Sequence, residues 1–409
     1  MRLLILSIRF SPEITGNANV ITGLARALAA NGHQVTVLAG TPHHSLDGVQ
    51  RGYLLSPFRW RSAEGMRVVN CWAFPKSNTK AAKFLNYASF TCTAFLATLF
   101  VGRTDAVLIV SPPFWLALVA LFLRLTRKCP VVYNAQDLFP EAYLASGEFH
   151  PGWFTNILSK LMLLVYQRSD RITVVADSFV KTIAAKGIDA AKIISIPNYV
   201  DTSAIAPLPR RNSFSRNAGL DDKFVVMYAG NMGFTHEVEL LVEAAKKLAV
   251  FEDIRLLVVG GGSKRHDLVR LAHERGTTNL DFLKTQPDKS LSEMLATADL
   301  FVLASKHGAG EASFPSRIYS YLLAGRPIVA SVDQELDLAR LLRKTGAGVV
   351  TQPGNAQSLC QAIENLYHDA PARERMARNG RAYMERDYSP RAVVESYDSL
   401  LKQLVDSRC

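Results

Sequence analysis

Short apolar runs alternate with longer amphipathic segments from the start of the chain. Leu3–Ser7 and Val35–Leu38 are apolar runs of strand length, and Ala18–Ala30 between them carries apolar residues at helical spacing. The loop before this helix contains Gly16, which would let the backbone approach a ligand closely, and Asn31-Gly32 is a stop signal for the helix. Strand, glycine-containing loop, helix and strand make a βαβ unit, which predicts the start of a doubly wound sheet.

The same alternation continues through the rest of the chain. Further strands are predicted at 105–110, 131–133, 171–176 and 193–197, and then at 224–229, 256–259, 300–304 and 328–330. The segments 355–367, 370–384 and 390–405 are predicted to be helical, and the loop-like 198–214, with two prolines and two arginines, is interpreted as an interdomain linker. We therefore predict an α/β protein of two Rossmann-like domains, residues 1–203 and 204–387, which agrees with the length of 409 residues.

The stretch from Gly308 to Ser331 combines a small-residue loop, a helix and a buried strand. Pro315 suits the first helical position because it has no N–H to leave unpaired, with Ser313 or Phe314 as the cap. A helix start preceded by small residues presents free N–H groups and a partial positive charge, so it suits a phosphate.

Two charged residues of this stretch support that interpretation. Arg317, in the first turn, opposes the helix dipole, a mismatch that an anion in front of the helix would explain. Glu311, four residues before Pro315, could accept hydrogen bonds from sugar hydroxyls. The alternative is a surface loop and a half-buried helix with an ordinary arginine.

Two other segments are candidate ligand sites. Asp137 comes just past the predicted strand 131–133, where open α/β sheets place their ligands. Gly260-Gly261-Gly262 follows another strand, but Arg265 occupies the place of the third glycine of a dinucleotide-binding motif, which argues against nicotinamide binding.

The net charge of +11 is concentrated in the first half of the chain. Residues 1–200 contain 20 Lys and Arg against 10 Asp and Glu, whereas residues 201–409 contain 27 against 26. Such asymmetry predicts an anionic partner for the first half, and the absence of a nucleic-acid motif favours a membrane surface over nucleic acid. Five unclustered cysteines and a start directly in a strand predict a reduced, cytosolic compartment with no signal peptide, disulfide framework or zinc site.

Two apolar segments of the first half are flanked by basic residues. They are 88–101, preceded by lysines within 76–83, and 115–123, followed by three basic residues. Both are too short to span a bilayer, which needs about 20 residues. They are either buried helices or part of a surface that docks on anionic lipid, and the charge balance favours partial membrane docking.

The stretch around Glu311 resembles the C-terminal signature of the family 4 retaining glycosyltransferases of the GT-B fold. That signature has two glutamates separated by seven residues; Glu311 matches the first and Tyr319 stands in place of the second. Pro-Ser-Arg at 315–317 and Gln-Asp-Leu-Phe-Pro-Glu at 136–141 resemble the bacterial subgroup that builds colanic acid, O-antigen and capsule repeats. The resemblance covers nearly the whole chain and implies two domains facing a central cleft, with a C-terminal helix, 388–409, packing back on the N-terminal domain.

The resemblance also implies residue roles. Glu311 would contact the donor sugar, and Tyr319 could offer only a phenolic hydroxyl to the nucleotide ribose. The loop at 230–233 has Asn231 where many members have an arginine, so Arg317, Lys306 and backbone N–H groups would have to meet more of the diphosphate charge. The proposed catalytic residues are Glu311, Asp137 and Arg317. The proposed acceptor residue is Glu141, for which the alternative role is to cap the next helix. The proposed donor-binding residues are Gly16, Asn231, Lys284, Lys306, His307, Ser313, Phe314, Pro315, Ser316 and Tyr319.

These features together predict a transferase that moves a sugar from a nucleoside-diphosphate sugar to a polyprenyl-diphosphate-linked acceptor. We expect a UDP-sugar as the donor, and we expect the enzyme to act at the inner face of the cytoplasmic membrane, to which it binds peripherally. The sequence contains no Asp-x-Asp, so no metal or other cofactor is expected, and fixed donors must stabilise the leaving diphosphate. Two alternatives remain open at this point: a GT-B protein that binds nucleotide-sugar or glycan without turnover, and a sugar-nucleotide 2-epimerase.

Overall fold

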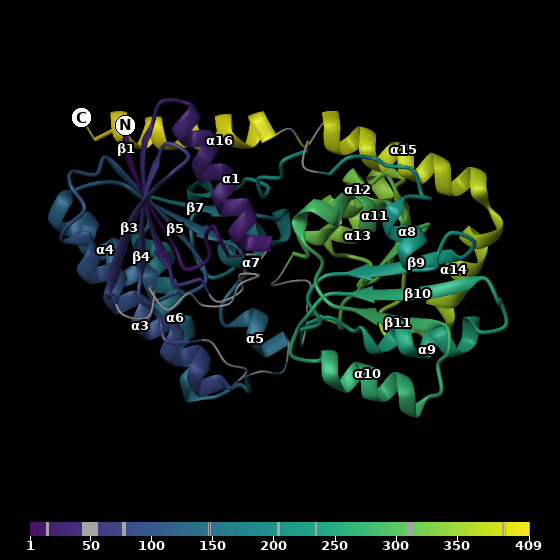
Figure 1. The fold of residues 1–409 in the computed structure, drawn as a ribbon. Helices are drawn as coiled ribbons and strands as arrows, with labels where there is room; N and C mark the ends of the chain where they lie inside the picture. The colour runs from purple at the N-terminus through teal and green to yellow at the C-terminus, as the bar shows by residue number, and fades with distance from the viewer. Residues whose placement is uncertain are drawn as a thin grey trace. The chain divides into compact units, whose positions relative to one another are not determined.

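The computed structural model describes residues 1–13, 16–42, 56–75, 79–145, 147, 149–202, 205–233, 235–308, 314–386, 388 and 390–408. The chain divides into two compact units (Figure 1). Unit 1 consists of Met1–Pro140, Pro151–Val200 and Pro390–Cys409, and unit 2 of Glu141–His150 and Asp201–Ser389. None of the helices in the described ranges has the length and apolar character needed to cross a bilayer.

Unit 1 is built on an eight-stranded sheet in the order β3-β4-β2-β1-β5-β6-β7-β8. All neighbouring strands pair in parallel except β3, which pairs antiparallel with β4. The strand order reverses direction between β1 and β5, the position where doubly wound sheets leave a crevice for ligands. The strands are β1 (Arg2–Ser7), β2 (Gln34–Gly40), β3 (Phe58–Ala63), β4 (Met66–Cys71), β5 (Ala106–Val110), β6 (Val131–Ala135), β7 (Arg171–Val174) and β8 (Ile193–Ser195).

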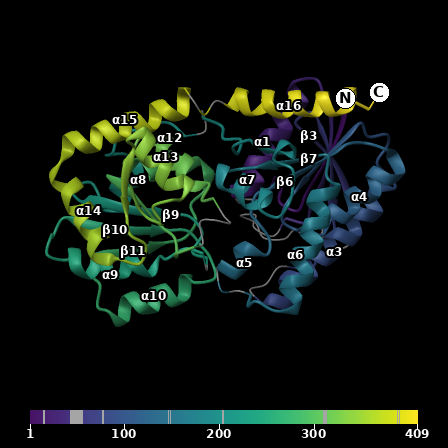
Figure 2. The ribbon, with the colours of Figure 1, turned by 180° about the vertical axis from the view of Figure 1, so that it is seen from behind.

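Helices cover both faces of this sheet (Figures 1 and 2). One face carries α1 (Gly16–Ala30) and α16 (Pro390–Asp406), whose apolar side chains join the core formed with β1, β2 and β5. The other face carries three adjacent helices, α3 (Lys80–Thr98), α4 (Leu116–Arg127) and α6 (Trp153–Arg168). In the part of unit 1 that the structure describes, the remaining helical segments are α7 (Asp177–Ala184) and a short 3₁₀ turn at Ala190–Lys192.

Polar contacts tie α16 to the rest of unit 1. His33 Nε2 lies 2.8 Å from Asp398 Oδ1, and the Asn134 side-chain amide donates to the Tyr397 hydroxyl at 2.8 Å. Asn134 also donates to Thr173 Oγ1 at 3.0 Å. Because these groups are largely buried, the helix is an integral part of the unit's core.

Unit 2 is built on a six-stranded parallel sheet in the order β11-β10-β9-β12-β13-β14. Its strands are β9 (Phe224–Ala229), β10 (Ile254–Val259), β11 (Leu280–Leu283), β12 (Leu300–Ala304), β13 (Ile328–Ser331) and β14 (Gly348–Thr351). Its helices are α5 (Glu141–Ala145), α8 (Ser213–Asn217), α9 (Glu239–Leu248), α10 (Arg265–Glu274), α11 (Leu291–Ala296), α12 (Arg317–Leu323), α13 (Asp337–Thr345), α14 (Ala356–His368) and α15 (Ala370–Arg386). The order reverses between β9 and β12, which makes that pair the switch point of this sheet.

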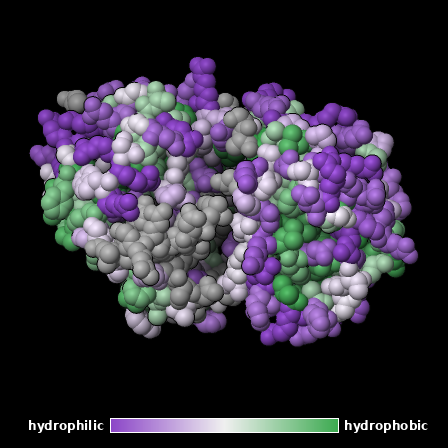
Figure 3. All heavy atoms as spheres, in the orientation of Figure 1, coloured by the Kyte–Doolittle hydropathy of each residue, from purple (hydrophilic) through white to green (hydrophobic). Residues whose placement is uncertain are grey.

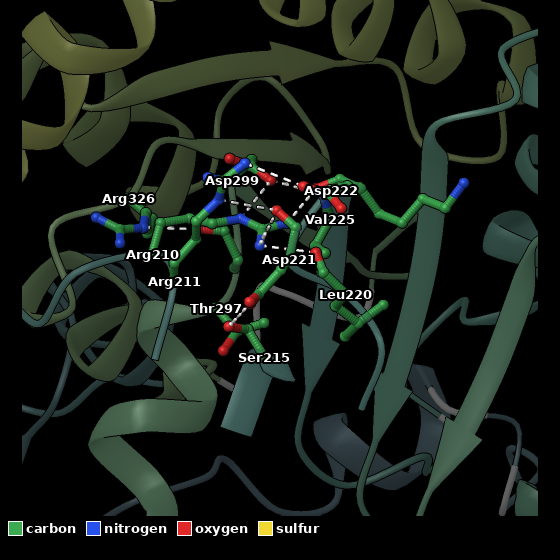
Figure 4. Close-up of polar contacts among 12 residues, drawn as sticks. Arg210, Arg211, Ser215, Leu220, Asp221, Asp222, Val225, Thr297, Asp299 and Arg326 are labelled. Carbon is green, nitrogen blue, oxygen red and sulfur yellow. Dashed lines mark hydrogen bonds and ion pairs between the residues drawn. The ribbon is translucent and has the colours of Figure 1, made fainter. Parts of the chain in front are cut away.

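An ion-pair cluster fixes the segment that leads into β9 (Figure 4). Arg210 Nε donates to Asp299 Oδ2 at 3.1 Å, and the same carboxylate oxygen accepts from the Val225 backbone N–H at 2.7 Å. Arg210 Nη1 also donates to the Leu220 carbonyl at 2.8 Å. Arg210, part of the segment interpreted as an interdomain linker, therefore holds the start of the second sheet in place.

The predicted strands are confirmed, but several elements differ from the prediction or were missed. The predicted helix at Pro315 is observed as α12, which begins at Arg317, two residues later. The elements that were not predicted are the antiparallel pair β3–β4, the strands β11 and β14, and the helices α6, α8, α11 and α13. In β3 no position is buried and two of the residues are arginines, so this edge strand has no apolar run.

Candidate functional site

The loops that follow β9 and β12 meet at the switch point of the second sheet. Ser305, just after β12, forms an isolated bridge with His236, and the Lys306 N–H donates to the Thr235 carbonyl at 3.2 Å. The Glu237 N–H donates to the Ala304 carbonyl at 3.1 Å. These bonds bring the loop at 230–236 and the predicted donor residues Lys306 and His307 to one edge of the sheet, where open α/β sheets bind their ligands.

Glycines allow the loops after β9 and β10 to pack closely. Gly230, Gly260 and Gly262 have φ angles of 151°, 140° and 138°, which side-chain-bearing residues rarely adopt. A Cβ atom on Gly260 would overlap the carbonyl oxygen of Gly230. Backbone bonds from Gly230 to Val259 (2.8 Å) and from Met232 to Gly261 (2.7 Å) join the two loops. Loop packing therefore requires glycine at 260 and 262, and this accounts for two glycines of the triplet without a dinucleotide-binding motif.

The guanidinium group of Arg317 lies under the loop at 230–233. It stacks on the ring of Tyr228 at 4.6 Å from the centroid, and its Nη2 atom donates to the Asn231 carbonyl at 3.1 Å and lies 2.9 Å from His236 Nε2. Its Nη1 atom is buried and has no hydrogen-bond partner within the described ranges. Acceptors of the protein itself thus engage Nη2 of the basic residue that opposes the dipole of α12, whereas Nη1 is left unpaired.

Burial and positive neighbours keep His236 neutral. Burial, then Arg317 and Lys264, lower the pKa of this histidine well below its usual value. A neutral imidazole can accept a hydrogen bond at Nε2, which is the role that the contact with the arginine requires. Since Tyr228 and His236 lie more than 80 residues before Arg317 in the chain, neither was identified from the sequence.

We expect His236 to make the stability of the protein depend on pH. Below about pH 6.5 the unfolded chain binds a proton on this residue that the folded chain excludes, so the free energy of unfolding falls as pH falls, by up to about 1.4 kcal/mol per pH unit. Denaturant unfolding between pH 7 and pH 5 should show a shallower loss of stability in His236→Gln than in the wild type. His266→Gln, at an exposed position on α10, is the matched control and should keep the wild-type slope. Equal slopes for all three proteins would contradict a neutral buried His236.

Tyr319 belongs to an aromatic cluster in unit 2. Its side chain is only 3% exposed and packs against Tyr388, with ring centroids 4.4 Å apart, and against Phe314 at 5.8 Å. Burial raises the pKa of its phenol. The assignment of Tyr319 to the donor ribose stays a prediction, and in this structure its ring packs against another tyrosine.

Of the remaining predicted donor residues of unit 2, those that the structure describes lie on or near the same edge. His307 Nδ1 contacts Asp333 Oδ1, and the Gly308 N–H donates to Asp333 Oδ2 at 2.7 Å, so one carboxylate fixes the chain just before residues 309–313. Lys284 is exposed directly after β11. Pro315 and Ser316 form the turn before α12, in which the Ile318 N–H donates to the Pro315 carbonyl at 3.1 Å. Glu311 and Ser313 lie outside the described residues.

The predicted residues of the first half lie at loops after strands or at helix starts. Gly16 is the first residue of α1, and Glu141 is the first residue of α5, as expected for a capping position. Asp137 is half-buried and follows β6, directly after Gln136. The Gln136 amide donates to Asn134 Oδ1 at 2.6 Å and to Asn198 Oδ1 at 2.9 Å, so a buried polar network fixes the segment that carries Asp137.

Comparison with known proteins identifies both halves of the chain. Residues 15–199 match the family described as "Glycosyl transferase 4-like domain", and residues 210–383 match "Glycosyl transferases group 1". The chain belongs to the family 4 glycosyltransferases. Within the described ranges, this glycosyltransferase has no group of three or more His, Cys, Asp or Glu residues arranged to hold a metal ion.

Relatives and solved structures extend this result. The glycosyltransferase is 25% identical over 391 residues, 91% of its own chain and 95% of the relative, to WcaI of Escherichia coli K12, whose name assigns it provisionally to colanic acid biosynthesis. Its fold is similar to sucrose-phosphate synthase of Thermosynechococcus elongatus (TM-score 0.78, 17% identity, all of both chains covered). It is also similar to HepE of Anabaena, solved with UDP and glucose (TM-score 0.71, 17% identity, 98% and 99% covered). The predicted GT-B fold and the predicted transferase activity are thereby confirmed.

Proposed function

We propose that this glycosyltransferase moves a sugar from a UDP-sugar, with retention at the anomeric carbon, to a lipid-linked oligosaccharide during the assembly of a bacterial surface polysaccharide. The observation that carries the proposal is the match of both halves of the chain to glycosyltransferase families. The names of relatives support the pathway class, since WcaI is assigned to colanic acid and another relative to the lipopolysaccharide core. HepE, solved with UDP and glucose, supports the choice of nucleotide.

The donor diphosphate is proposed to bind at the loops after β9, β10 and β12. Chemistry at this site requires that the charge of the departing diphosphate be met by preorganised donors. The candidate hydrogen-bond donors are the backbone N–H groups of Phe314, Ser316 and Arg317. The side chains of Lys306 and Lys284 are further candidates. The buried, unpaired Nη1 atom of Arg317 supports an anionic ligand near this loop, because a charged donor without a partner is costly.

The other roles are proposed from the family signature. Glu311 is assigned to the donor sugar and Asp137 to the acceptor hydroxyl, with Glu141 on the acceptor side. The acceptor's diphosphate suits unit 1, where the positive charge of the chain is concentrated. Retention would follow if the acceptor hydroxyl attacks on the face that the diphosphate leaves.

The donor is identified by saturation-transfer binding against UDP-, GDP- and dTDP-sugars, followed by measurement of nucleoside diphosphate release. We expect one UDP-sugar to bind and to release UDP when bacterial membrane lipid extract supplies the acceptor. Binding without release would support the non-catalytic alternative, and a C2-epimerised nucleotide-sugar as the product would support the epimerase alternative.

Substitution of Glu311 tests its assignment to the donor sugar. Glu311→Gln is expected to lower the rate of UDP release about 100-fold, because the carboxylate that holds the reacting sugar is lost. The melting temperature should stay close to that of the wild type. Glu335→Gln is the control, since the Glu335 side chain is 89% exposed and belongs to a surface ion pair. Wild-type release by Glu311→Gln would remove this residue from the site.

A further inference from the structure

Exposed apolar side chains gather on one helical layer of unit 1. Of the fifteen large hydrophobic side chains that are exposed in the described ranges, eleven lie on α3, the turn after it, α4 and α6. Figure 3 shows hydrophobic atoms at the left margin of the molecule, over the helices labelled α3 and α4 in Figure 1. We call this surface the three-helix face; its exposed members are Phe84, Leu85, Leu96, Leu99, Phe100, Leu118, Leu125, Trp153, Phe154, Ile157 and Leu164.

The three helices form one continuous layer. Phe95 of α3 packs edge-on against Phe122 of α4 with ring centroids 4.8 Å apart, and Phe84 of α3 lies 6.0 Å from Trp115 at the start of α4. Helices α4 and α6 are also in contact, and Arg124 of α4 donates to the backbone carbonyl of Arg168 at the end of α6. The exposed apolar side chains therefore lie on adjoining helices rather than at scattered positions.

Helix α6 is apolar on two opposite sides. Leu158, Met162 and Val165 are buried against the unit, as a surface helix requires. On the outer side, Trp153, Ile157, Lys160, Leu164 and Arg168 follow one another at helical spacing, and all five are exposed. A helix on the surface of a protein that faces only water normally has a polar outer stripe. The outer stripe of α6 thus indicates a partner that accepts apolar side chains.

The charge of the three-helix face is of one sign. Helices α3, α4 and α6 contain no Asp or Glu, whereas they contain six Lys and Arg. Asp105 and Asp170, which lie close to the ends of these helices in the chain, are engaged by arginines. Asp105 pairs with Arg2 at 2.6 Å, and Asp170 pairs with Arg124 at 3.2 Å and with Arg408 at 2.5 Å. The layer is therefore both apolar and positively charged, without a compensating acidic group of its own.

We propose that the three-helix face docks on an anionic phospholipid bilayer, with the outer stripe of α6 and the turn at Leu99-Phe100 in the headgroup region. Apolar and aromatic side chains enter that region while Lys and Arg meet lipid phosphates. A second copy of the chain is the less favoured occupant, because a symmetric contact would place basic residues against basic residues. The role of this surface in the reaction rests on the proposed function, in which the acceptor is linked to a lipid. Binding of the surface to a bilayer can be measured without sugar transfer.

Sedimentation with vesicles tests the proposal on the full chain. The wild type is expected to pellet with vesicles of phosphatidylcholine and 30% phosphatidylglycerol at low salt, and at least 10-fold more weakly with phosphatidylcholine alone. Trp153→Ser/Ile157→Ser and Lys160→Glu/Arg168→Glu should each weaken binding to the anionic vesicles at least 10-fold. Val250→Ser/Val269→Ser is the matched control, because it removes exposed aliphatic side chains from unit 2, and it should bind like the wild type. Equal binding by all variants would overturn the proposal.

A probe on α3 tests the location of the contact. Cys92 is exposed, and Cys71, Cys129 and Cys360 are buried, so an environment-sensitive dye on Cys92 in a Cys409→Ser background reports on this face. A blue shift of its emission with anionic vesicles is expected, and vesicle binding without a shift would assign docking to another surface. Sedimentation equilibrium tests whether a second copy of the chain binds this face instead. If the wild type is a dimer and Trp153→Ser/Ile157→Ser is a monomer, the partner of the face is a second copy and not a bilayer. UDP release from the donor in detergent should be unchanged in these variants, so a failure of docking and a failure of transfer are distinguishable.

Discussion

Arg317→Met is expected to lower the rate of sugar transfer about 1000-fold, at the upper end of the cost of removing a preorganised electrostatic group. Methionine fills much of the volume, but it cannot donate to the Asn231 carbonyl or to His236 Nε2, which are 3.1 Å and 2.9 Å from Nη2. The loop that follows β9 would lose its hydrogen bond to the Arg317 guanidinium group. The leaving diphosphate would lose a nearby positive charge. We expect a loss of about 3 kcal/mol in the free energy of unfolding, since the stacking on Tyr228 and the hydrogen bonds to Asn231 and His236 are lost together.

The Arg317→Lys variant separates the effect of the positive charge from the effect of the guanidinium geometry. Arg317→Lys keeps the positive charge but cannot reproduce the planar stacking on Tyr228 together with both hydrogen bonds. We expect about 10-fold slower transfer and a loss of stability between those of the wild type and of methionine. Arg340→Met removes an arginine from a surface ion pair in the same unit and should change stability by less than about 0.5 kcal/mol. Transfer by Arg317→Met at the wild-type rate would show that the group has a structural role alone.

The second large effect is expected from Gly260→Ala. The residue has φ near 140°, and a Cβ atom there would overlap the backbone carbonyl of Gly230, an obstacle that cannot rotate away. We expect a loss of about 3 kcal/mol of stability and a loss of donor binding, because the loops after β9 and β10 must separate. Chemical denaturation and saturation-transfer binding measure the two effects.

The neighbouring glycine provides the control for this experiment. A Cβ atom on Gly261 would meet only Thr285 Oγ1, at 3.8 Å, which is ordinary van der Waals contact. Gly261→Ala should therefore retain donor binding and lose less than about 1 kcal/mol. If both variants lost similar stability and donor binding, the glycines would be needed for the flexibility of the loop and not for the close approach of two backbones.

The sequence predicts the strands of both sheets well and the environment of the site poorly, for physical reasons. Buried parallel strands are short apolar runs, and these are local signals. The partners of Arg317 are not local, because Tyr228 and His236 come from the loop and strand of another βα unit. The sequence pattern shows that an arginine is misplaced in a first helical turn, but not which acceptors compensate for it.

Helix α6 was missed because its sequence lacks the signal on which prediction depends. An amphipathic helix is recognised by a polar stripe opposite the apolar one, and α6 is apolar on both sides. The apolar residues on its outer side, which hid the helix from prediction, also form part of the surface that we propose to dock on lipid. Such an exception to a local sequence rule is expected at a functional surface.

The return of the chain from unit 2 to unit 1 determines when the first unit can be completed during translation. Val393, Tyr397 and Leu401 of α16 are buried in a core whose other members lie mostly within the first 200 residues. While the ribosome synthesises unit 2, the nascent unit 1 must keep that apolar surface uncovered, which makes it a natural client for a chaperone. Emergence of α16, rather than of residue 200, from the exit tunnel is then the event that closes the first core.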